Sequence, residues 1–445
     1  MGFTIEEIVI YLIVFLLCGG IIYWYLRKIA KTSQITEKKV EKAKEDGTFE
    51  PVSLHPYIDL GTCIGSGACI SACPEKDILG IVNGKATVIN ASSCIGHGAC
   101  FHACPVEAIS LRIGTEKRGV ELPHVHQTFE TNMKGIYIAG ELGGMGLIKN
   151  SVEQGKQAMD NIAKTIVKKE GITDVIIIGA GPAGISATLN AKKHGLSSIT
   201  LEQDSLGGTV YSFPRTKIVM TSPMDLPLYG KAKLYNTSKD ELLDIWNEAL
   251  SKNDIEIIEK SKVDRIVPLE NGTFKLIVSN GKEYISNKVL IAIGRRGTPR
   301  KLGIEGEDKP KVFYKLLDAE QIEGQDILVV GGGDSAVESA MLLMDQNNVT
   351  LSYRKDKFGR LKPANRDKIK AAIDSGKINM VFNSNLKEVE KEIVHLSIDG
   401  EDEMMSIKND LVYVFIGGEL PTRFLQDAGI EIQKRFGYVV KKHGS

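Results

Sequence analysis

The chain contains no cysteine after Cys104, although it is 445 residues long and has seven cysteines in all. A redox-active Cys-x-x-Cys pair is therefore excluded from the last three quarters of the sequence. The chain also lacks a charge bias, because Lys plus Arg and Asp plus Glu both number 56. Charge thus gives no reason to expect a nucleic-acid partner. Its length exceeds what one hydrophobic core serves, so about three domains are expected.

Six of the cysteines form two strings with the same spacing, Cys63-x5-Cys69-x3-Cys73-Pro74 and Cys94-x5-Cys100-x3-Cys104-Pro105. Each string resembles the bacterial ferredoxin run C-x2-C-x2-C-x3-C-P with its second cysteine replaced, by Ser66 in the first copy and by His97 in the second. The fourth cysteine of such a run usually ligates the other cluster. The resemblance therefore implies two cross-paired sites, one of Cys63, Cys69 and Cys104 and one of Cys73, Cys94 and Cys100.

Three cysteines at each site leave the bound group open. They suit a three-iron cluster, or a four-iron cluster whose last iron takes Ser66, His97 or water. The alternatives are a degenerate ferredoxin fold without metal and a zinc site. Zinc is often bound by close Cys-x2-Cys pairs, which this spacing does not supply. Thiols arranged as cluster ligands indicate a reducing compartment.

The one long apolar segment covers residues 8–26, which carry no charge. As a helix it reaches roughly 28 Å, near the thickness of a bilayer's hydrocarbon core. Acidic residues precede it, whereas Arg27, Lys28 and Lys31 follow it. This asymmetry predicts a single-pass anchor in the cytoplasmic membrane, with the bulk of the chain in the cytoplasm. The alternative is a hydrophobic docking helix. Residues 28–56, rich in Lys and Glu, are expected to form a polar helical stalk or linker.

A first dinucleotide-binding fingerprint begins at Asp174, where an apolar strand leads into a G-x-G-x-x-G turn and a helix. Glycines in such a turn let the backbone approach a pyrophosphate and let the helix pack on the strand. Glu202 ends the next predicted strand, where its carboxylate can accept a bond from a ribose. The predicted binding residues are Gly179, Gly181, Pro182, Ala183, Gly184 and Glu202.

A second fingerprint begins at Asp326 and again predicts a strand, a glycine turn and a helix. Its predicted binding residues are Gly331, Gly333, Asp334, Ser335 and Ala336. No acid ends the next strand; the cations Arg354, Lys355 and Arg360 follow instead. Cations pair with a 2′-phosphate that a carboxylate would repel, which favours NADPH over NADH. A solvated strand edge is the alternative.

Residues 171–445 resemble the flavoprotein family of thioredoxin reductases and thioredoxin-reductase-like ferredoxin reductases. The resemblance is carried by Gly331-Gly-Gly-Asp-Ser-Ala-Val-Glu338, by Ile291-Ala-Ile-Gly294 and by Ile416-Gly-Gly-Glu-Leu-Pro-Thr422. It implies an FAD domain, an NAD(P)H domain and hydride transfer between the two cofactors. Members of the family commonly dimerise.

The family's closing strand and helix are missing from the C-terminus and resemble an earlier segment, Thr131-Asn-Met-Lys-Gly-Ile-Tyr-Ile-Ala-Gly140-Glu141, followed by a helix to about Lys168. The flavin domain is therefore expected to be circularly permuted. Glu141 replaces the family's aspartate, and Gly140 and Glu141 are predicted to bind FAD. The alternative is an ordinary strand and helix of the ferredoxin module.

The departures from the family indicate the electron route. Bacillithiol-disulfide-reductase-like relatives carry a cysteine in the first glycine turn, where this chain has Ala183. No protein thiol can then pass electrons from the flavin to a disulfide, and the iron–sulfur module is the remaining outlet. No acid–base catalyst is predicted; His124 and His126 precede the flavin element, and a surface or packing role is favoured for both.

These inferences predict an α/β chain with two Rossmann-like domains, a small α+β ferredoxin-like module and one transmembrane helix. The expected boundaries are an anchor at 1–27, a linker at 28–56, the Fe–S module at 57–114, the permuted flavin segment at 115–168, the FAD domain at 171–296, the NAD(P)H domain at 297–414 and a return to the FAD domain at 415–445. The favoured function is an anchored oxidoreductase passing electrons between NAD(P)H, FAD and two clusters and a protein or membrane partner. The alternatives are a ferredoxin–NADP reductase working toward NADP reduction and a redox-sensing scaffold subunit.

Overall fold

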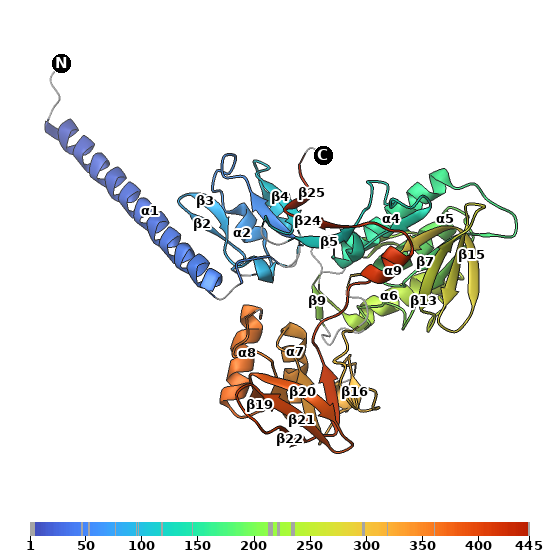
Figure 1. The fold of residues 1–445 in the computed structure, drawn as a ribbon. Helices are drawn as coiled ribbons and strands as arrows, with labels where there is room; N and C mark the ends of the chain where they lie inside the picture. Colours follow the sequence, from blue (N-terminus) through green and yellow to red (C-terminus); the bar gives the residue numbers. More distant parts are fainter. Residues whose placement is uncertain are drawn as a thin grey trace. The chain divides into compact units, whose positions relative to one another are not determined.

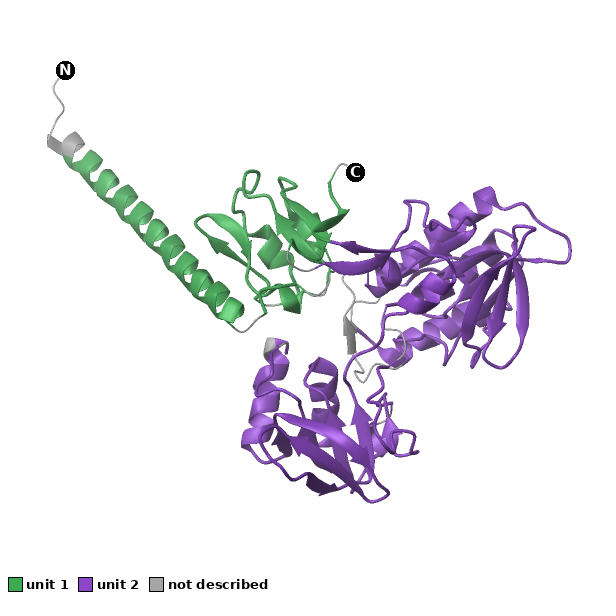
Figure 2. Ribbon diagram, in the orientation of Figure 1, with its two compact units in different colours: residues 1–118, 436–445 green, residues 119–435 purple. Residues whose placement is uncertain are grey.

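The computed structural model divides into two compact units, and each is described by itself (Figures 1 and 2). Unit 1 comprises residues 1–118 and 436–445, and unit 2 comprises residues 119–435. The structure describes residues 5–45, 48–51, 54–75, 77–94, 96, 98–116, 119–144, 146–211, 217–219, 223–232, 236–295, 299–317, 319–359 and 361–443.

Unit 1 contains a long helix and a small α+β module (Figure 2). The helix is α1 (Ile5–Glu45), and the module contains β1 (His55–Ile58), α2 (Ala68–Ala72), β2 (Leu79–Val82), β3 (Lys85–Val88), η1 (Ala91–Ser93), α3 (Ala99–Ala103) and β4 (Ile109–Ile113). A left-handed glycine, Gly67 or Gly98, precedes each short helix. The two cysteine strings thus have the same local fold, a turn followed by one helical turn.

Helix α1 continues 19 residues past Leu26, and its second half packs on the module. Ser33, Thr36 and Ala43 are buried there, at positions that share one helix face. Gly80 on β2 permits the approach, because a Cβ at this position would lie 2.5 Å from the Thr36 methyl carbon. Residues 28–45 are thus helical, as the expected stalk would be, but they pack on the module and are not a free linker.

The last residues also differ from expectation at one boundary. Strand β25 (Tyr438–Lys441) pairs antiparallel with β4 and completes the three-stranded sheet β1-β4-β25 of unit 1. The expected return to the FAD domain at 415–445 therefore stops short, and residues 436–445 belong to unit 1. The physical reason is that the free edge of β4 offers backbone partners to a strand distant in sequence.

The first sheet of unit 2 has the order β13-β14-β15-β7-β8, with β6 on β15. Its strands are β6 (Ile136–Ile138), β7 (Thr173–Ile178), β8 (Ser198–Leu201), β13 (Val263–Pro268), β14 (Phe274–Val278) and β15 (Glu283–Ile291). Strands β6, β15, β7 and β8 run parallel. Their apolar residues are buried on both faces, as in a doubly wound sheet.

The second sheet of unit 2 is fully parallel, in the order β16-β23-β17-β18-β19. Its strands are β16 (Val312–Phe313), β17 (Asp326–Val330), β18 (Asn348–Ser352), β19 (Ile378–Val381) and β23 (Leu411–Val414), with helices α7 (Asp334–Leu343) and α8 (Pro363–Asp374). A three-stranded antiparallel sheet accompanies it, made of β20 (Ser384–Val389), β21 (Ile393–Ile398) and β22 (Met405–Lys408).

The remaining elements of unit 2 are strands and helices outside these sheets; η3 packs with α7 of the second sheet. They are β5 (Val120–Pro123), η2 (Glu141–Gly143), α4 (Ile148–Thr165), α5 (Pro182–Lys193), β9 (Lys217–Val219), β10 (Met224–Leu226), β11 (Gly230–Ala232), β12 (Asn236–Ser238), α6 (Lys239–Ser251), η3 (Ala319–Gln321), α9 (Thr422–Asp427) and β24 (Ile432–Arg435).

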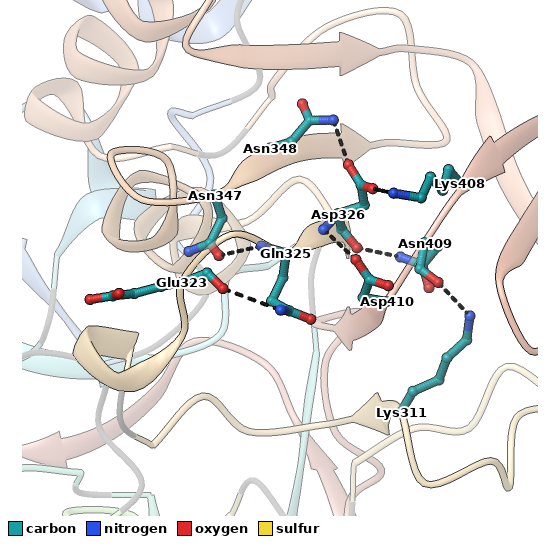
Figure 3. A network of polar contacts seen from close by, with 9 residues as sticks. All are labelled: Lys311, Glu323, Gln325, Asp326, Asn347, Asn348, Lys408, Asn409 and Asp410. Atoms are coloured by element: carbon teal, nitrogen blue, oxygen red, sulfur yellow. Dashed lines mark hydrogen bonds and ion pairs between the residues drawn. The ribbon is translucent and has the colours of Figure 1, made fainter.

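A polar network fastens the amino edge of the second sheet (Figure 3). The Asp326 N–H donates to the Asp410 carboxylate at 2.8 Å, and its own carboxylate accepts from Asn348 at 2.8 Å and pairs with Lys408 at 2.7 Å. The Lys408 ammonium, more than any other neighbour, holds the pKa of Asp326 below its ordinary value. The network is structural, because ligands of parallel sheets bind at the opposite, carboxyl edge.

Candidate functional site

The first predicted cysteine set lines one cavity of unit 1. Cys63, Cys69 and Cys104 surround it, and Ser66 also lines it. The rest of the wall is mainly apolar, formed by Ile58, Ile64, Ala86, Val106, Ala108 and Ile109. Cys104 comes from the second string, so the cavity joins the two strings as the cross-paired arrangement requires.

Backbone N–H groups point at two sulfurs of this set. Gly65 and Ala86 each donate to Cys63 Sγ at 3.4 Å, and Ala108 donates to Cys104 Sγ at 3.2 Å. Such bonds stabilise the negative charge of thiolates that hold a cluster and tune its potential. These donors escaped sequence analysis, because the residues that supply them carry no side-chain chemistry.

The second set is Cys73, Cys94 and Cys100. Helices α2 and α3 contact each other; Cys73 ends α2, and Cys100 lies on α3. Burial raises the pKa of Cys94 to about 11 and that of Cys100 to about 12, and the charge of Cys73 acts in the same direction on both. No disulfide joins any of the six cysteines. His97 lies outside the described residues, whereas Ser66 is exposed.

Two groups of three thiols, one of them in a cavity with mainly apolar walls, fit the donor set of an iron–sulfur cluster. Metal binding removes the thiol protons, so the raised pKa values couple cluster assembly to pH. When bound, such clusters accept and release single electrons. Cys18, on the exposed half of α1, belongs to neither group.

The first glycine turn of unit 2 has the form that a dinucleotide needs. A Cβ on Gly184 would lie 1.8 Å from the carbonyl oxygen of Gly179, so helix α5 packs directly on the turn. Gly181 has no atom within 4 Å of such a Cβ, which leaves room for a pyrophosphate beside the turn. Pro182 and Ala183 begin α5, whose N-terminus favours an anion.

Glu202 lies at the carboxyl end of β8, beside this turn. Its carboxylate accepts the Ala180 N–H at 2.7 Å and the Asp204 N–H at 2.9 Å. Burial raises the pKa of Glu202 above its ordinary value against both of these bonds. The side chain is thus fixed next to the glycine turn, as a ribose-binding carboxylate requires.

The segment predicted to be permuted joins the same sheet. Strand β6 lies parallel to β15, and the Ala139 N–H donates to the Ile291 carbonyl at 3.1 Å. Helix α4 lies against α5, where a Cβ on Gly155 would come within 2.0 Å of the Ala183 carbonyl oxygen. The alternative of a ferredoxin-module strand and helix is therefore wrong, because both elements complete the sheet of unit 2.

Gly140 and Glu141 follow β6. The Gly140 N–H donates to the Gln154 side chain at 2.9 Å, and its φ of 86° requires a glycine-like backbone. A Cβ on Gly140 would lie 3.1 Å from that of Ala183. The structure thus brings the predicted closing residues to the first glycine turn.

The second glycine turn repeats the geometry. Gly331 has a φ of 142°, and a Cβ there would lie 2.4 Å from the Phe415 carbonyl oxygen. Gly333 caps α7, Ser335 lies in its first turn, and Ala336 is buried. The Asp334 carboxylate accepts from the Lys362 N–H at 3.0 Å and from Asn365 at 2.7 Å.

Sequence analysis missed the aromatic wall of this turn. A Cβ on Gly332 would lie 2.3 Å from the Tyr353 ring, and Tyr353 stacks on Phe358 with ring centres 5.8 Å apart. Arg354 and Lys355 follow Tyr353 and are exposed, whereas Arg360 lies outside the described residues. The two cations are therefore free of the core.

His124 and His126 follow β5, with ring centres 4.8 Å apart in an edge-to-face contact. The Nδ1 atom of His124 is buried and has no hydrogen-bond partner among the described residues. Nothing around either ring assigns it a catalytic role.

Comparison with known sequences identifies both halves of the chain. Residues 176–443, more than half of the chain, match the family "Pyridine nucleotide-disulphide oxidoreductase". This chain belongs to that family. Residues 55–105 match the "4Fe-4S dicluster domain" family. The chain therefore combines a pyridine nucleotide oxidoreductase with a 4Fe-4S dicluster domain, as the sequence predicted.

Two curated proteins and one solved structure are similar to part of the chain. The chain is 29% identical over 269 residues to Bacilliredoxin reductase Bdr of Bacillus subtilis, covering 59% of this chain and 82% of the relative. It is 32% identical over 217 residues to Ferredoxin--NADP reductase of Ignicoccus hospitalis, covering 48% and 66%. A solved structure of Bacillithiol Disulfide Reductase Bdr from Staphylococcus aureus aligns at 26% identity and a TM-score of 0.49, covering 59% of this chain and 84% of that one.

This member of the pyridine nucleotide-disulphide oxidoreductase family is an FAD-dependent NAD(P)H oxidoreductase. It has no redox-active disulfide, because its last cysteine is Cys104. One helix among the described residues, α1, is long and apolar enough to cross a membrane.

Proposed function

We propose that the chain is a membrane-anchored oxidoreductase that moves electrons between NADPH, FAD and two iron–sulfur clusters, and from there to a protein or membrane partner. Flavin supplies the junction, because it exchanges hydride with nicotinamide and single electrons with metal clusters. The protein's own residues hold the groups and set their surroundings.

The observation that carries this proposal is the cross-pairing of the cysteine strings. Cys104 lies with Cys63 and Cys69 around one cavity, whereas no other cysteine is encoded after it. A family member without a thiol beside its flavin needs another outlet. The two thiol groups of unit 1 provide one.

We propose the following residues for each group, and the turns described above support the choice. FAD is assigned to Gly179, Gly181, Gly184, Glu202, Gly140 and Glu141. The nicotinamide nucleotide is assigned to the Gly331–Ala336 turn, with Arg354 and Lys355 pairing with a 2′-phosphate. The clusters are assigned to the two three-cysteine sets.

The anchor is assigned to residues 8–26 of α1. Their described apolar side chains are strongly exposed, from 50% at Val9 to 77% at Phe15. Exposure of this kind is unstable in water and is satisfied by lipid. The cations that follow support a cytoplasmic location for the rest of the chain.

Anaerobic purification of the full chain tests the core of the proposal. We expect flavin, iron and acid-labile sulfide together, and bleaching of the flavin by NADPH followed by reduced-cluster signals in electron paramagnetic resonance. Cys104→Ser and Cys63→Ser should alter the same cluster signal. Cys94→Ser should alter the other signal, which the first two variants leave intact. Cys18→Ser is the control and should change neither. A yellow protein without iron would refute the proposal.

Nucleotide preference has its own test. Replacing Arg354 by Ala should lower kcat/KM for NADPH by roughly 10- to 100-fold, the loss of one charge-assisted bond of about 1.5–3 kcal/mol. Flavin reduction by NADH should stay unchanged, because NADH has no 2′-phosphate. Equal losses with both nucleotides would contradict the assignment.

The reverse direction is the second candidate. The relatives from Ignicoccus hospitalis and Picrophilus torridus, both 32% identical, are named Ferredoxin--NADP reductase. In that case electrons enter through the clusters and reduce NADP. Cluster potentials well below that of the flavin favour NADP reduction, and cluster potentials above it favour outflow from NADPH.

A further inference from the structure

The two cysteine sets of unit 1 are connected to different positions along the axis of α1. Strand β2 runs beside this helix toward its N-terminus: Asp77 pairs with Lys39 at 2.5 Å, Gly80 meets Thr36, and the Asn83 N–H donates to Ser33 at 3.0 Å. The β2–β3 turn is thus the part of this hairpin closest to the apolar half of α1.

The loop that carries Cys63 lies on this turn. A Cβ on Gly65 would come within 2.0 Å of the Gly84 carbonyl oxygen, so the two backbones touch. The Lys85 ammonium donates to the Cys63 carbonyl oxygen at 2.5 Å, and the Ala86 N–H reaches the Cys63 sulfur. Contacts therefore connect Ser33 of α1 to the first cysteine set within a few residues.

The second set is joined to the other end of α1. The Thr48 N–H donates to the Ala43 carbonyl at 2.8 Å, and the Thr48 carbonyl accepts the Ser92 N–H at 3.0 Å. Ser92 lies in η1, which leads directly into Cys94. The Cys94 string is thus fastened where α1 ends.

The rise per residue of an α-helix gives the distance of each contact from the end of the apolar segment. Ser33 is seven residues past Leu26, or roughly 10 Å along the axis, and Glu45 is 19 residues past it, or roughly 28 Å. The headgroup layer on one side of a bilayer is about 5–8 Å thick. The β2–β3 turn then lies at the lipid surface, and the Cys94 string lies far above it.

The side chains near the turn suit a lipid surface. Ile64, which follows Cys63 and lines its cavity, is 63% exposed, and Asn83 and Gly84 at the tip are exposed as well.

We propose that unit 1 rests on the phospholipid bilayer through the Ile64 loop and the β2–β3 turn. The site of Cys63, Cys69 and Cys104 is then the membrane-proximal one and that of Cys73, Cys94 and Cys100 the distal one. This rests on the membrane anchor proposed above. It directs electron exchange at the proximal site toward acceptors that reside in the membrane.

Tryptophan quenching in lipid nanodiscs tests the contact. In a Trp24→Phe background, with the full cofactor-loaded chain, Ile64→Trp should be strongly quenched by lipids brominated on their acyl chains. Phe49→Trp is the matched control, because it lies in unit 1 beyond the end of α1, and it should not be quenched. Trp246 is buried in unit 2 and gives a constant background.

A helix insertion tests the cause. Seven alanines between Lys31 and Thr32 lift the module by roughly 10 Å and turn it by only about 20° relative to the anchor. Quenching of the Ile64→Trp variant should then fall to the level of Phe49→Trp. Equal quenching with and without the insertion would overturn the proposal.

A measurement without substitution at Ile64 covers the case in which that variant loses iron. Cys100→Ser keeps the proximal cluster, and Cys69→Ser keeps the distal one. Paramagnetic nickel on chelating lipid headgroups should speed the spin relaxation of the proximal cluster several-fold more than that of the distal cluster. Equal relaxation contradicts the proposed order. Vesicle flotation distinguishes failure of the anchor from failure of the contact. A chain that does not float with vesicles refutes the anchor. A chain that floats but whose Ile64→Trp fluorescence is not quenched refutes only the contact.

Discussion

Single glycines decide whether unit 2 can receive a dinucleotide. Gly181 and Gly184 stand three residues apart in the same fingerprint, yet their surroundings differ. A Cβ on Gly184 would strike the Gly179 carbonyl oxygen at 1.8 Å, whereas one on Gly181 meets nothing within 4 Å. Gly184 lets helix α5 pack on the turn, and Gly181 leaves space beside the turn for a ligand.

We therefore predict different failures for two similar substitutions. Gly184→Ala should destabilise unit 2 by more than the roughly 1–3 kcal/mol typical of overpacking, because the obstacle is backbone. Gly181→Ala should leave the melting temperature of flavin-free protein nearly unchanged and lower its affinity for FAD. Thermal melts and flavin titration check both. Normal FAD binding by Gly181→Ala would contradict the assignment of this turn.

The buried thiols predict a pH effect in metal-free protein. Burial raises the pKa of Cys94 to about 11, so the unfolded chain, whose thiols titrate near 9.0, releases protons first. Below pH 9 both states keep their protons, and these thiols add no pH dependence. As pH rises from 9 toward 11, the free energy of unfolding should fall.

Urea unfolding of chelator-treated protein at about pH 8 and about pH 10 measures this effect. Cys94→Ser should flatten the dependence, and cluster-loaded protein should lack it because its thiols are already deprotonated. A metal-free protein that is more stable at the higher pH would show that the thiols are not buried.

At the scale of elements, β25 is the most informative strand. It pairs with β4, and the His443 ring that follows it stacks on Phe101 at 3.7 Å between centres. His443 also contacts the Phe101 carbonyl oxygen at 3.1 Å. Phe101 directly follows Cys100, so the C-terminus supports the helix that carries this ligand.

Truncation after Arg435 should therefore weaken the Fe–S module selectively. It exposes the edge of β4 and removes an aromatic stack of about 0.5–1.5 kcal/mol. We expect iron content to fall while flavin content stays near that of the full chain. Removal of Gly444 and Ser445 alone keeps β25 and serves as the control. Full iron retention after the longer truncation would contradict a supporting role for β25.

Local chemistry made much of this predictable. The cysteine spacing predicted cross-paired sites, and the structure brings Cys104 to Cys63 and Cys69. The glycine turns predicted the parallel strands at the centre of both sheets, because strand, turn and helix are adjacent in sequence. Strand β25 was missed, since Tyr438-Val-Val-Lys441 fits any strand edge and its partner lies more than 300 residues away. The packing of residues 28–45 was also missed, because this Lys- and Glu-rich stretch suggested a polar stalk and its contact depends on Gly80, a residue of another element.

At the scale of the whole molecule, α1 has two halves with separate tasks. Residues 9–26 are exposed along their length, whereas Ser33, Thr36 and Ala43 are buried against the module. The helix is continuous through both halves. Removing the exposed half should therefore abolish membrane binding. Removing both halves should also weaken the binding of the clusters.

We predict that deletion of residues 1–27 gives a water-soluble protein with unchanged iron, flavin and NAD(P)H-dependent dye reduction. Deletion of residues 1–45 should lower the iron content as well, because the packed half is lost. Metal analysis, absorption spectra and membrane fractionation measure these outcomes. Persistent membrane association of the shorter deletion would show that another surface binds lipid.

The return of β25 to the sheet of β1 and β4 has a consequence for biosynthesis. Domains generally fold in the order in which they leave the ribosome, yet the third strand of this N-terminal module is encoded by residues 438–441. While the oxidoreductase is being translated, the outer edge of β4 stays open. Iron loading of a finished module must therefore wait until residues 438–441 have been translated, and a chain that stops just before them is a flavoprotein with an incomplete metal carrier.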